Sequence, residues 1–276
     1  MKAIACALPA EQGLPLSRLS ISEIASLAVE KGIVETISPG TVWRWLEEDA
    51  LRPWFHRPWL FCPDPDFAEK AGRVLDLYQG LWQGEPLSAD DYVFCADEKT
   101  QIQLLCRKGR ILPPRPRQVM RFENSYERLG TVVYLAALDV FSGRVFGKVE
   151  KRNGIRPFNR LVKQVMEQEP YRSARRVFWV VDNGPAHHPS TFPRRLKEMY
   201  PNAIAVHLPI HASWLNQIEL YFSILQRKAL TPVDFADVQE ATERILGFEQ
   251  RYNRTAAPFS WNFSRDKLGK RLKLLA

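Results

Sequence analysis

The apolar run Val177–Val181 constrains the fold of this chain more than any other feature, and Asp182 follows it directly. A strand with one face in water alternates apolar and polar residues, whereas a strand that is apolar throughout is covered on both faces. Helices must therefore pack on both sides of the sheet that contains this strand. The run predicts a layered α/β domain.

The elements around the run predict which α/β fold this is. Hydrophobic patterns indicate strands at residues 92–97, 101–106, 131–140, 144–150 and 203–208, and helices at about 157–168, 190–200 and 213–228. A turn is expected between the first two strands. Several strands followed by alternating helices and strands is the order of a ribonuclease-H-like domain, a mixed sheet flanked by helices.

The first part of the chain is predicted to be a small helical, helix-turn-helix-like segment. A capping box at residues 20–23 begins a helix that ends near Gly32, and a Ser-Pro pair at 38–39 begins a second. Thr41 and Arg44 then lie on the face that would enter a DNA major groove. Any packed pair of helices would show the same pattern, so the motif is compatible with a purely structural role.

Four prolines between residues 51 and 66 exclude a regular element there and indicate a linker. Arg52 and Arg57 alternate with tryptophans in this linker, which is typical of an arm that contacts DNA or of a strap docked by its aromatic rings. A helix is expected at 67–82. The predicted divisions are 1–62 (DNA-binding segment and linker), 63–90 (connecting helix), 91–230 (catalytic domain) and 231–276 (basic helical tail).

The charge of the chain favours a polyanionic partner, because the formal net charge is +8. Residues 105–128 hold seven basic and two acidic side chains, and residues 265–276 hold five and one. Arg107, Lys108 and Arg110 are therefore candidates for DNA contact, although such clusters are also common on solvated faces. No apolar run approaches the roughly 20 residues that span a bilayer. We expect a cytoplasmic protein without a membrane partner.

Three acids occupy positions where a carboxylate lowers stability. Asp97 and Asp182 each end a predicted strand, and Glu219 falls on the apolar stripe of the predicted helix 213–228. An acid that faces a protein interior must be paired, protonated or bound to a metal. Three such acids in this order of elements predict a site for two Mg²⁺ ions, which could activate a water or a 3′-hydroxyl for attack on a phosphodiester.

Other residues compete for these roles. Glu98 would point to the opposite face of its strand from Asp97, and Asp139 lies beside a hairpin turn, where aspartate is common. His207 and His211 have a spacing that could bind zinc on a helix, but the proline between them disfavours a helix.

Three motifs identify a family. Residues 96–100 (ADEKT), 181–188 (VDNGPAHH) and 211–219 (HASWLNQIE) resemble the catalytic blocks of bacterial insertion-sequence transposases in the mariner-related DDE superfamily. The 36 residues that separate Asp182 from Glu219 are close to the spacing in that group. The resemblance covers most of the chain, which begins near the point where a first helix-turn-helix of the relatives would end.

The resemblance implies a function. Asp97, Asp182 and Glu219 would be the catalytic DDE triad and would bind two Mg²⁺ or Mn²⁺ ions, with Asn183, His187 and Asn216 supporting them. The protein would cut element ends in double-stranded DNA and join 3′-hydroxyls to a TA target, as a homodimer associated with the nucleoid. A catalytically inactive DNA-binding remnant and another ribonuclease-H-like nuclease are the alternatives.

Overall fold

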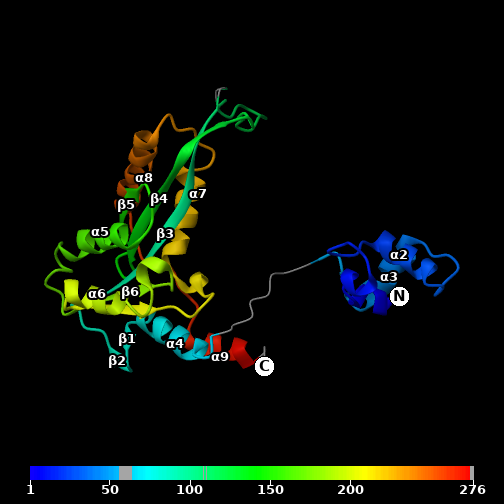
Figure 1. The fold of residues 1–276 in the computed structure, drawn as a ribbon, viewed down its shortest axis with the longest axis horizontal. Coiled ribbons are helices and arrows are strands. Elements are labelled where there is room, and N and C mark those ends of the chain that lie inside the picture. The colour runs from blue at the N-terminus through cyan, green and yellow to red at the C-terminus, as the bar shows by residue number, and fades with distance from the viewer. Residues whose placement is uncertain (56–63, 108, 110, 274–276) are drawn as a thin grey trace. The chain divides into compact units, whose positions relative to one another are not determined.

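The structure, a computed structural model, describes residues 1–55, 64–107, 109 and 111–273 (Figure 1). It divides the chain into two compact units, Met1–Phe61 and Cys62–Ala276. Three residues predicted to contact DNA lie outside the described residues, namely Arg57, Lys108 and Arg110.

The first unit is helical, with α1 (Lys2–Cys6), the 3₁₀ turn η1 (Pro9–Gln12), α2 (Ile21–Glu30) and α3 (Pro39–Glu48). Both predicted helix starts are confirmed. The Ser20 hydroxyl accepts from the Glu23 backbone N–H and the Glu23 carboxylate from that of Ser20, while the Ser38 hydroxyl accepts from the Thr41 N–H. These caps satisfy backbone donors that a helix leaves free at its first turn. Leu19, Ile24, Ala28, Val42 and Leu46 form the buried core of this unit.

The second unit is built on a mixed five-stranded sheet, which confirms the predicted fold class. Its strands are β3 (Asp91–Cys106), β4 (Glu127–Asp139), β5 (Val145–Glu150), β6 (Arg176–Val181) and β7 (Ala203–His207), in the spatial order β5-β4-β3-β6-β7. Strands β3, β6 and β7 run parallel, and β4 is antiparallel to both β3 and β5.

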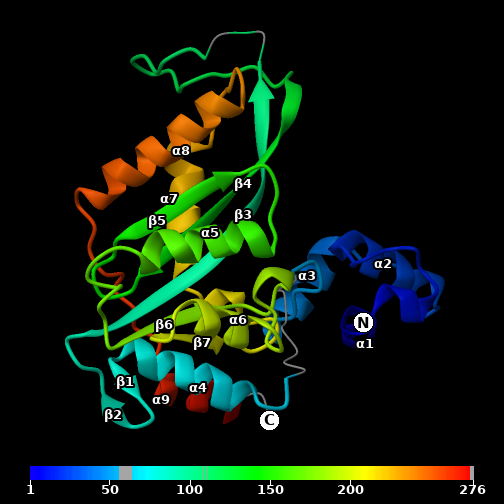
Figure 2. The same ribbon diagram turned by 60° about the vertical axis from the view of Figure 1, so that its left-hand side comes forward.

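Helices cover both faces of this sheet, as the apolar run predicts (Figure 2). One face packs on α5 (Ile155–Met166) and α6 (Phe192–Met199). The other face packs on α4 (Phe67–Tyr78), α7 (Ile218–Ala229) and α8 (Val238–Asn253), and α9 (Arg265–Lys273) packs beside α4. Residues Val177–Val181 are fully buried because successive side chains enter the two opposite cores.

The structure corrects the prediction of two strands at 92–97 and 101–106. A single strand, β3, spans both, and its pairing with β4 shifts register between Lys99 and Ile102. The irregularity is a bulge at Thr100 and Gln101, and Gln101 has a positive φ of 54°. A bulge lets a strand bend and continue where a turn would end it. Asp97 therefore lies inside a strand instead of at its end.

The structure also corrects the predicted helix 213–228. Residues Ser213–Leu215 form a separate 3₁₀ turn, η3, and α7 begins only at Ile218. Asn216 between them has extended backbone angles, and its side chain donates a hydrogen bond to the carbonyl of Ala96. This contact with β3 explains the break.

The remaining differences are small. Helix α4 ends at Tyr78, and Leu81–Trp82 forms strand β1, which pairs with β2 (Glu85–Pro86). Beyond the rest of the sheet, β3 and β4 run on into a long hairpin arm, described at residues 101–107, 109 and 111–132 (Figure 1). Among the described helices, none is both long and apolar enough to cross a membrane.

Candidate active site

The candidate site lies where the pairing between β3 and β6 ends. Cys95 pairs with Val180, and continuing this parallel register by two residues brings Asp97 level with Asp182. Binding sites in open α/β sheets form at this carboxyl edge of the parallel strands. The buried Asp97 carboxyl, with 7% of the residue exposed, accepts a hydrogen bond of 2.7 Å from the Glu98 N–H. Burial, and next the charge of Asp182, raise the pKa of Asp97 to about 8.

Asp182 is the first residue after β6, and the following loop holds its carboxylate in place. Its Oδ1 accepts a hydrogen bond of 2.7 Å from the Gly184 N–H and lies 2.7 Å from Nε2 of His187. A Cβ on Gly184 would lie 2.9 Å from this Nε2 and 3.0 Å from the Oδ1. Such contacts are too close, so only glycine leaves room here. The Asp182 side chain is 32% exposed and can be reached from solvent.

Glu219 lies in the first turn of α7, exposed at the rim of the site. The prediction that Glu219 faces inward is therefore wrong. The break at Asn216 ends the regular helix spacing that would place Glu219 on the same face as Leu215. Partial desolvation by the surrounding protein raises the pKa of Glu219, as does the charge of Asp182, while Lys99 lowers it. Glu219 in turn raises the pKa of Asp97. The three acids are thus close enough to repel one another.

Glu98 and His187 also reach this cluster. Glu98 stands on the opposite face of β3 from Asp97, as predicted, yet its carboxylate lies 3.7 Å from the His187 ring nitrogen. Burial, and next Asp182, raise the pKa of Glu98 to about 7, and burial lowers the pKa of His187 to about 4. Single ligand atoms of Asp97, Glu98 and His187 all lie within 4.8 Å of one another. Alternation of faces along a strand places Glu98 opposite Asp97, but both faces are accessible where a neighbouring strand stops.

The two asparagines hold the backbone around the acids. The amide of Asn216 donates to the Ala96 carbonyl and lies 3.4 Å from Oδ2 of Asp97. Asn183 donates to the Leu208 carbonyl at 2.9 Å, which ties the loop after β6 to the end of β7. Asn216 thus touches a carboxylate of the cluster, whereas the bond of Asn183 is structural.

Sequence and structure comparisons place this site in a family. The model of the DDE superfamily endonuclease family matches residues 92–241, just over half of the 276 residues. The chain belongs to this family. It is accordingly an enzyme of the polynucleotidyl transferase and endonuclease class.

Solved structures show the same fold as this endonuclease. The Mos1 mariner paired end complex with Mn is 13% identical, with a TM-score of 0.52 over 98% of this chain and 76% of that chain. The Mos1 strand transfer complex is also 13% identical, with a TM-score of 0.51 over 99% and 76%. At this identity the likeness concerns the fold, a ribonuclease-H-like domain preceded by helices. None of the curated proteins matches the chain.

The residues of the endonuclease fit the divalent metal ion that DDE nucleases use. Carboxylate oxygens are the donors that Mg²⁺ and Mn²⁺ prefer. The buried ring nitrogens of His187 and the buried amide oxygens of Asn216 and Gln217 have no hydrogen-bond partner. Repelling carboxylates beside unpaired polar atoms are the pattern that a bound cation, with its water ligands, would satisfy.

Two of the other competing residues, Asp139 and His207, are engaged elsewhere in the structure. Asp139 pairs with Phe94 in the sheet, three positions from the partner of Asp97. Its carboxylate accepts from the backbone N–H of Phe141 and from the Tyr171 hydroxyl, so it forms the turn and supports the core. The ring of His207 bonds to the His187 carbonyl at 2.8 Å, which leaves this nitrogen unavailable to zinc.

The described candidates for DNA binding differ in how strongly their side chains are engaged within the protein. Arg44 is exposed on α3 and donates to the Thr41 hydroxyl, and Arg52 forms an ion pair of 3.3 Å with Glu47. The Arg107 side chain is only 8% exposed, because its guanidinium pairs with Asp234 at 2.6 Å and lies 5.1 Å from the centre of the Phe122 ring. The ion pair with Asp234 gives Arg107 a structural role that requires no contact with DNA.

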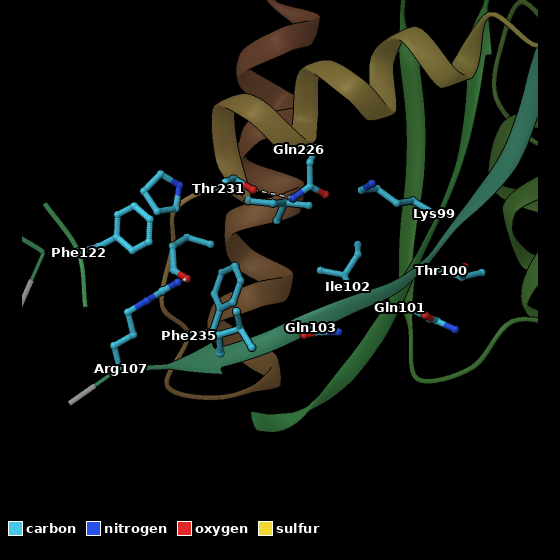
Figure 3. A pocket seen from close by; sticks show the side chains of 14 residues that line it. Lys99, Thr100, Gln101, Ile102, Gln103, Arg107, Phe122, Gln226, Thr231 and Phe235 are labelled. Carbon is cyan, nitrogen blue, oxygen red and sulfur yellow. Dashed lines mark hydrogen bonds between the residues drawn. The ribbon is translucent and has the colours of Figure 1, made fainter. Parts of the chain in front are cut away.

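A cavity of about 330 Å³ opens at the base of the arm, between β3 and the end of α7 (Figure 3). Its walls combine apolar side chains such as Phe235 and Ile102 with the amides of Gln101, Gln103 and Gln226. Lys99 lines the cavity and also acts electrostatically on Glu219. Lys99 thus connects the acidic cluster to this cavity.

Proposed function

We propose that this endonuclease is a DNA transposase that cuts the ends of its element and joins the resulting 3′-hydroxyls to target DNA. Asp97, Asp182 and Glu219 would be its catalytic triad. The observation that carries the proposal is the meeting of these three acids at the carboxyl edge of β3 and β6, in a chain of the DDE endonuclease family. The likeness to two Mos1 transposition complexes supports it.

The triad would hold two Mg²⁺ or Mn²⁺ ions, which supply the charge that activates the attacking hydroxyl and stabilises the leaving oxygen of the phosphodiester. The protein's own groups orient the triad. Asn216 contacts Asp97, and the Gly184 N–H donates a hydrogen bond to Asp182. The cationic Lys99 lies beside Glu219, where it can attract a DNA phosphate.

Nicking of supercoiled plasmid by the full chain, with Mg²⁺, Mn²⁺ or EDTA, tests the proposal. We expect nicking with either metal and none with EDTA. Asp182→Asn should abolish nicking while DNA binding persists, whereas Glu198→Gln, an exposed acid on α6, should cut like the parent chain. Binding without nicking in the parent chain would instead favour an inactive remnant. Cutting of RNA/DNA hybrids or junctions irrespective of sequence would favour another nuclease.

Double-stranded DNA is the proposed partner, bound by a homodimer that pairs two element ends, and TA is the proposed target. A net charge of +8 supports a polyanionic partner. Sequencing of the junctions made with an oligonucleotide that ends in a 3′-hydroxyl tests the target, since insertion at random dinucleotides contradicts TA selection. Light scattering of the DNA complex tests the dimer.

A further inference from the structure

We propose that Asp97, Glu98 and His187 form a cation position with one nitrogen ligand, which binds Mn²⁺ in preference to Mg²⁺. This inference deepens the proposed function, because Asp97 belongs to both sets of ligands. It adds Glu98 and His187 to the carboxylates of the triad. The consequence is a preference for Mn²⁺ over Mg²⁺, which the triad alone, with oxygen donors only, would not produce.

The first support is the distance between the donor atoms. One atom from each of the three side chains lies within 4.8 Å of the other two. Bonds from a divalent ion to nitrogen or oxygen are about 2.0–2.2 Å long, so ligands on opposite sides of one ion are roughly 4 Å apart. The three side chains can therefore reach a common ion with only small adjustments.

The second and independent support is the state of the His187 ring. The residue is wholly buried, with 0% exposed, and neither ring nitrogen has a hydrogen-bond partner. Nε2 nevertheless points into the acid cluster, 2.7 Å from Asp182 and 3.7 Å from Glu98. A buried polar atom without a partner is costly. A cation among these carboxylates would give this nitrogen a bond in place of the hydrogen bond that it lacks, and would neutralise the acids around it.

The ring of His187 is held in this position by its surroundings. Phe158 and Phe192 pack against it edge to face, with ring centres at 4.9 and 6.3 Å. His207 bonds to its backbone carbonyl, and Gly184 leaves the space beside Nε2 open. A ligand whose orientation is fixed before binding loses little entropy when the ion arrives.

The neighbouring His188 provides a contrast. It is exposed, and its Nδ1 lies 2.9 Å from the hydroxyl of Ser190. The same residue type, one position along the chain, is thus exposed and already has a partner. His188 is therefore the matched control for His187.

A nitrogen donor changes the preference among metals. Mg²⁺ favours oxygen ligands and keeps several waters, whereas imidazole is a good ligand for transition metals. We therefore expect the protein to bind Mn²⁺ more tightly than Mg²⁺, and the advantage should diminish when His187 is replaced by an oxygen donor.

Pulsed electron paramagnetic resonance of Mn²⁺ bound to the full chain tests this proposal without DNA. We expect ¹⁴N coupling to the bound ion, and a change to ¹⁵N coupling when the protein is labelled with ¹⁵N-histidine. His187→Gln should remove the coupling and weaken Mn²⁺ binding about tenfold. His188→Gln should retain both. Because the labelled parent chain reports the ligand directly, the test does not depend on whether the buried variant folds.

The outcomes distinguish this proposal from the proposed function. Mn²⁺ bound with oxygen coupling only, or ¹⁴N coupling that persists in His187→Gln, would overturn the nitrogen ligand even if plasmid nicking is normal. Absence of Mn²⁺ binding would overturn it as well. Nitrogen coupling in a chain that never cuts DNA would support the cation position and contradict the transposase.

Discussion

At the scale of single residues, two carboxyl groups of the site resist ionisation when no metal is bound. The pKa of Asp97 is raised to about 8 and that of Glu98 to about 7, mainly by burial. The ordinary values in an unfolded chain are about 4. The folded protein therefore binds these protons more tightly than the unfolded chain, and the stability that they contribute is lost as the pH rises from about 4 to about 8.

The substitution Asp97→Asn should accordingly stabilise the metal-free protein at high pH. In EDTA we expect the parent chain to lose thermal stability between pH 5.5 and 8. The variant should lose less and be more stable at pH 8 by on the order of 2 kcal/mol. Calorimetry at the two pH values measures this difference. Glu198→Gln should keep the profile of the parent chain, and an unchanged profile in Asp97→Asn would contradict the charge argument.

At the scale of elements, two irregular backbone segments give the site its shape. The bulge at Thr100 and Gln101 keeps β3 continuous past Asp97, and the break at Asn216 sets where α7 and Glu219 begin. The hydroxyl of Tyr78, from α4, donates to the Leu215 carbonyl at 2.8 Å and lies 3.0 Å from the Cys95 sulfur. One partly buried tyrosine thus links the break in the chain to the strand that carries Asp97.

Because of the bulge, the same substitution should have different effects on stability at the two nearby glutamines Gln101 and Gln103. Gln101 has a φ of 54°, a conformation that β-branched residues avoid, whereas Gln103 is exposed in the regular part of β3. Gln101→Val should lower the free energy of unfolding by about 1–2 kcal/mol. Gln103→Val should be neutral or slightly stabilising, because valine favours strands. Equal effects in denaturant titrations would show that backbone conformation is not the cause.

Removal of the Tyr78 hydroxyl should affect both stability and the site. Tyr78→Phe leaves the buried Leu215 carbonyl without this donor, which we expect to cost about 1–3 kcal/mol. Metal-dependent nicking should fall as well, because Glu219 follows this turn. Tyr92→Phe, on a tyrosine that packs against Tyr171 on the other face of the sheet, is the control. A loss of stability with full nicking activity would mean that the turn does not position Glu219.

The regular elements could be predicted from the sequence, and the irregular ones could not. Caps at Ser20 and Ser38 and the apolar run before Asp182 act locally, so their patterns are visible in the chain. The bulge and the break contain no glycine or proline, the residues that usually mark such sites. Asn216 interrupts a helical pattern because it bonds to Ala96, 120 positions away. The proximity of His187 to Glu98 is likewise a product of the tertiary fold.

At the scale of the whole molecule, positive charge and apolar surface meet on the arm. Arg115, Arg117 and Arg121 are exposed there, as are Val119 and Met120. Two isolated bridges, Leu112 with Arg121 and Arg115 with Gln118, keep the arm as a narrow ribbon. An exposed ribbon with this charge is suited to follow a DNA backbone.

The salt dependence of DNA binding tests this role of the arm. Replacing Arg115, Arg117 and Arg121 together by glutamine should weaken duplex binding at low salt and reduce the slope of log K against log salt by up to about three. The matched control replaces Lys163, Arg172 and Arg194, exposed basic residues around α5 and α6, by glutamine. Equal slopes in the two triple variants would indicate that net charge alone determines binding.

The continuity of β3 has a consequence for how this protein tolerates insertions and deletions. One strand carries Asp97 and runs on into the arm, and the bulge separates the two parts. A one-residue slip reverses which face each side chain occupies. Loss of a single residue between Asp91 and Asp97 would thus exchange Asp97 and Glu98 across the sheet, whereas the tip of the arm can vary in length without moving either. Variation in length among related chains should therefore concentrate at the tip.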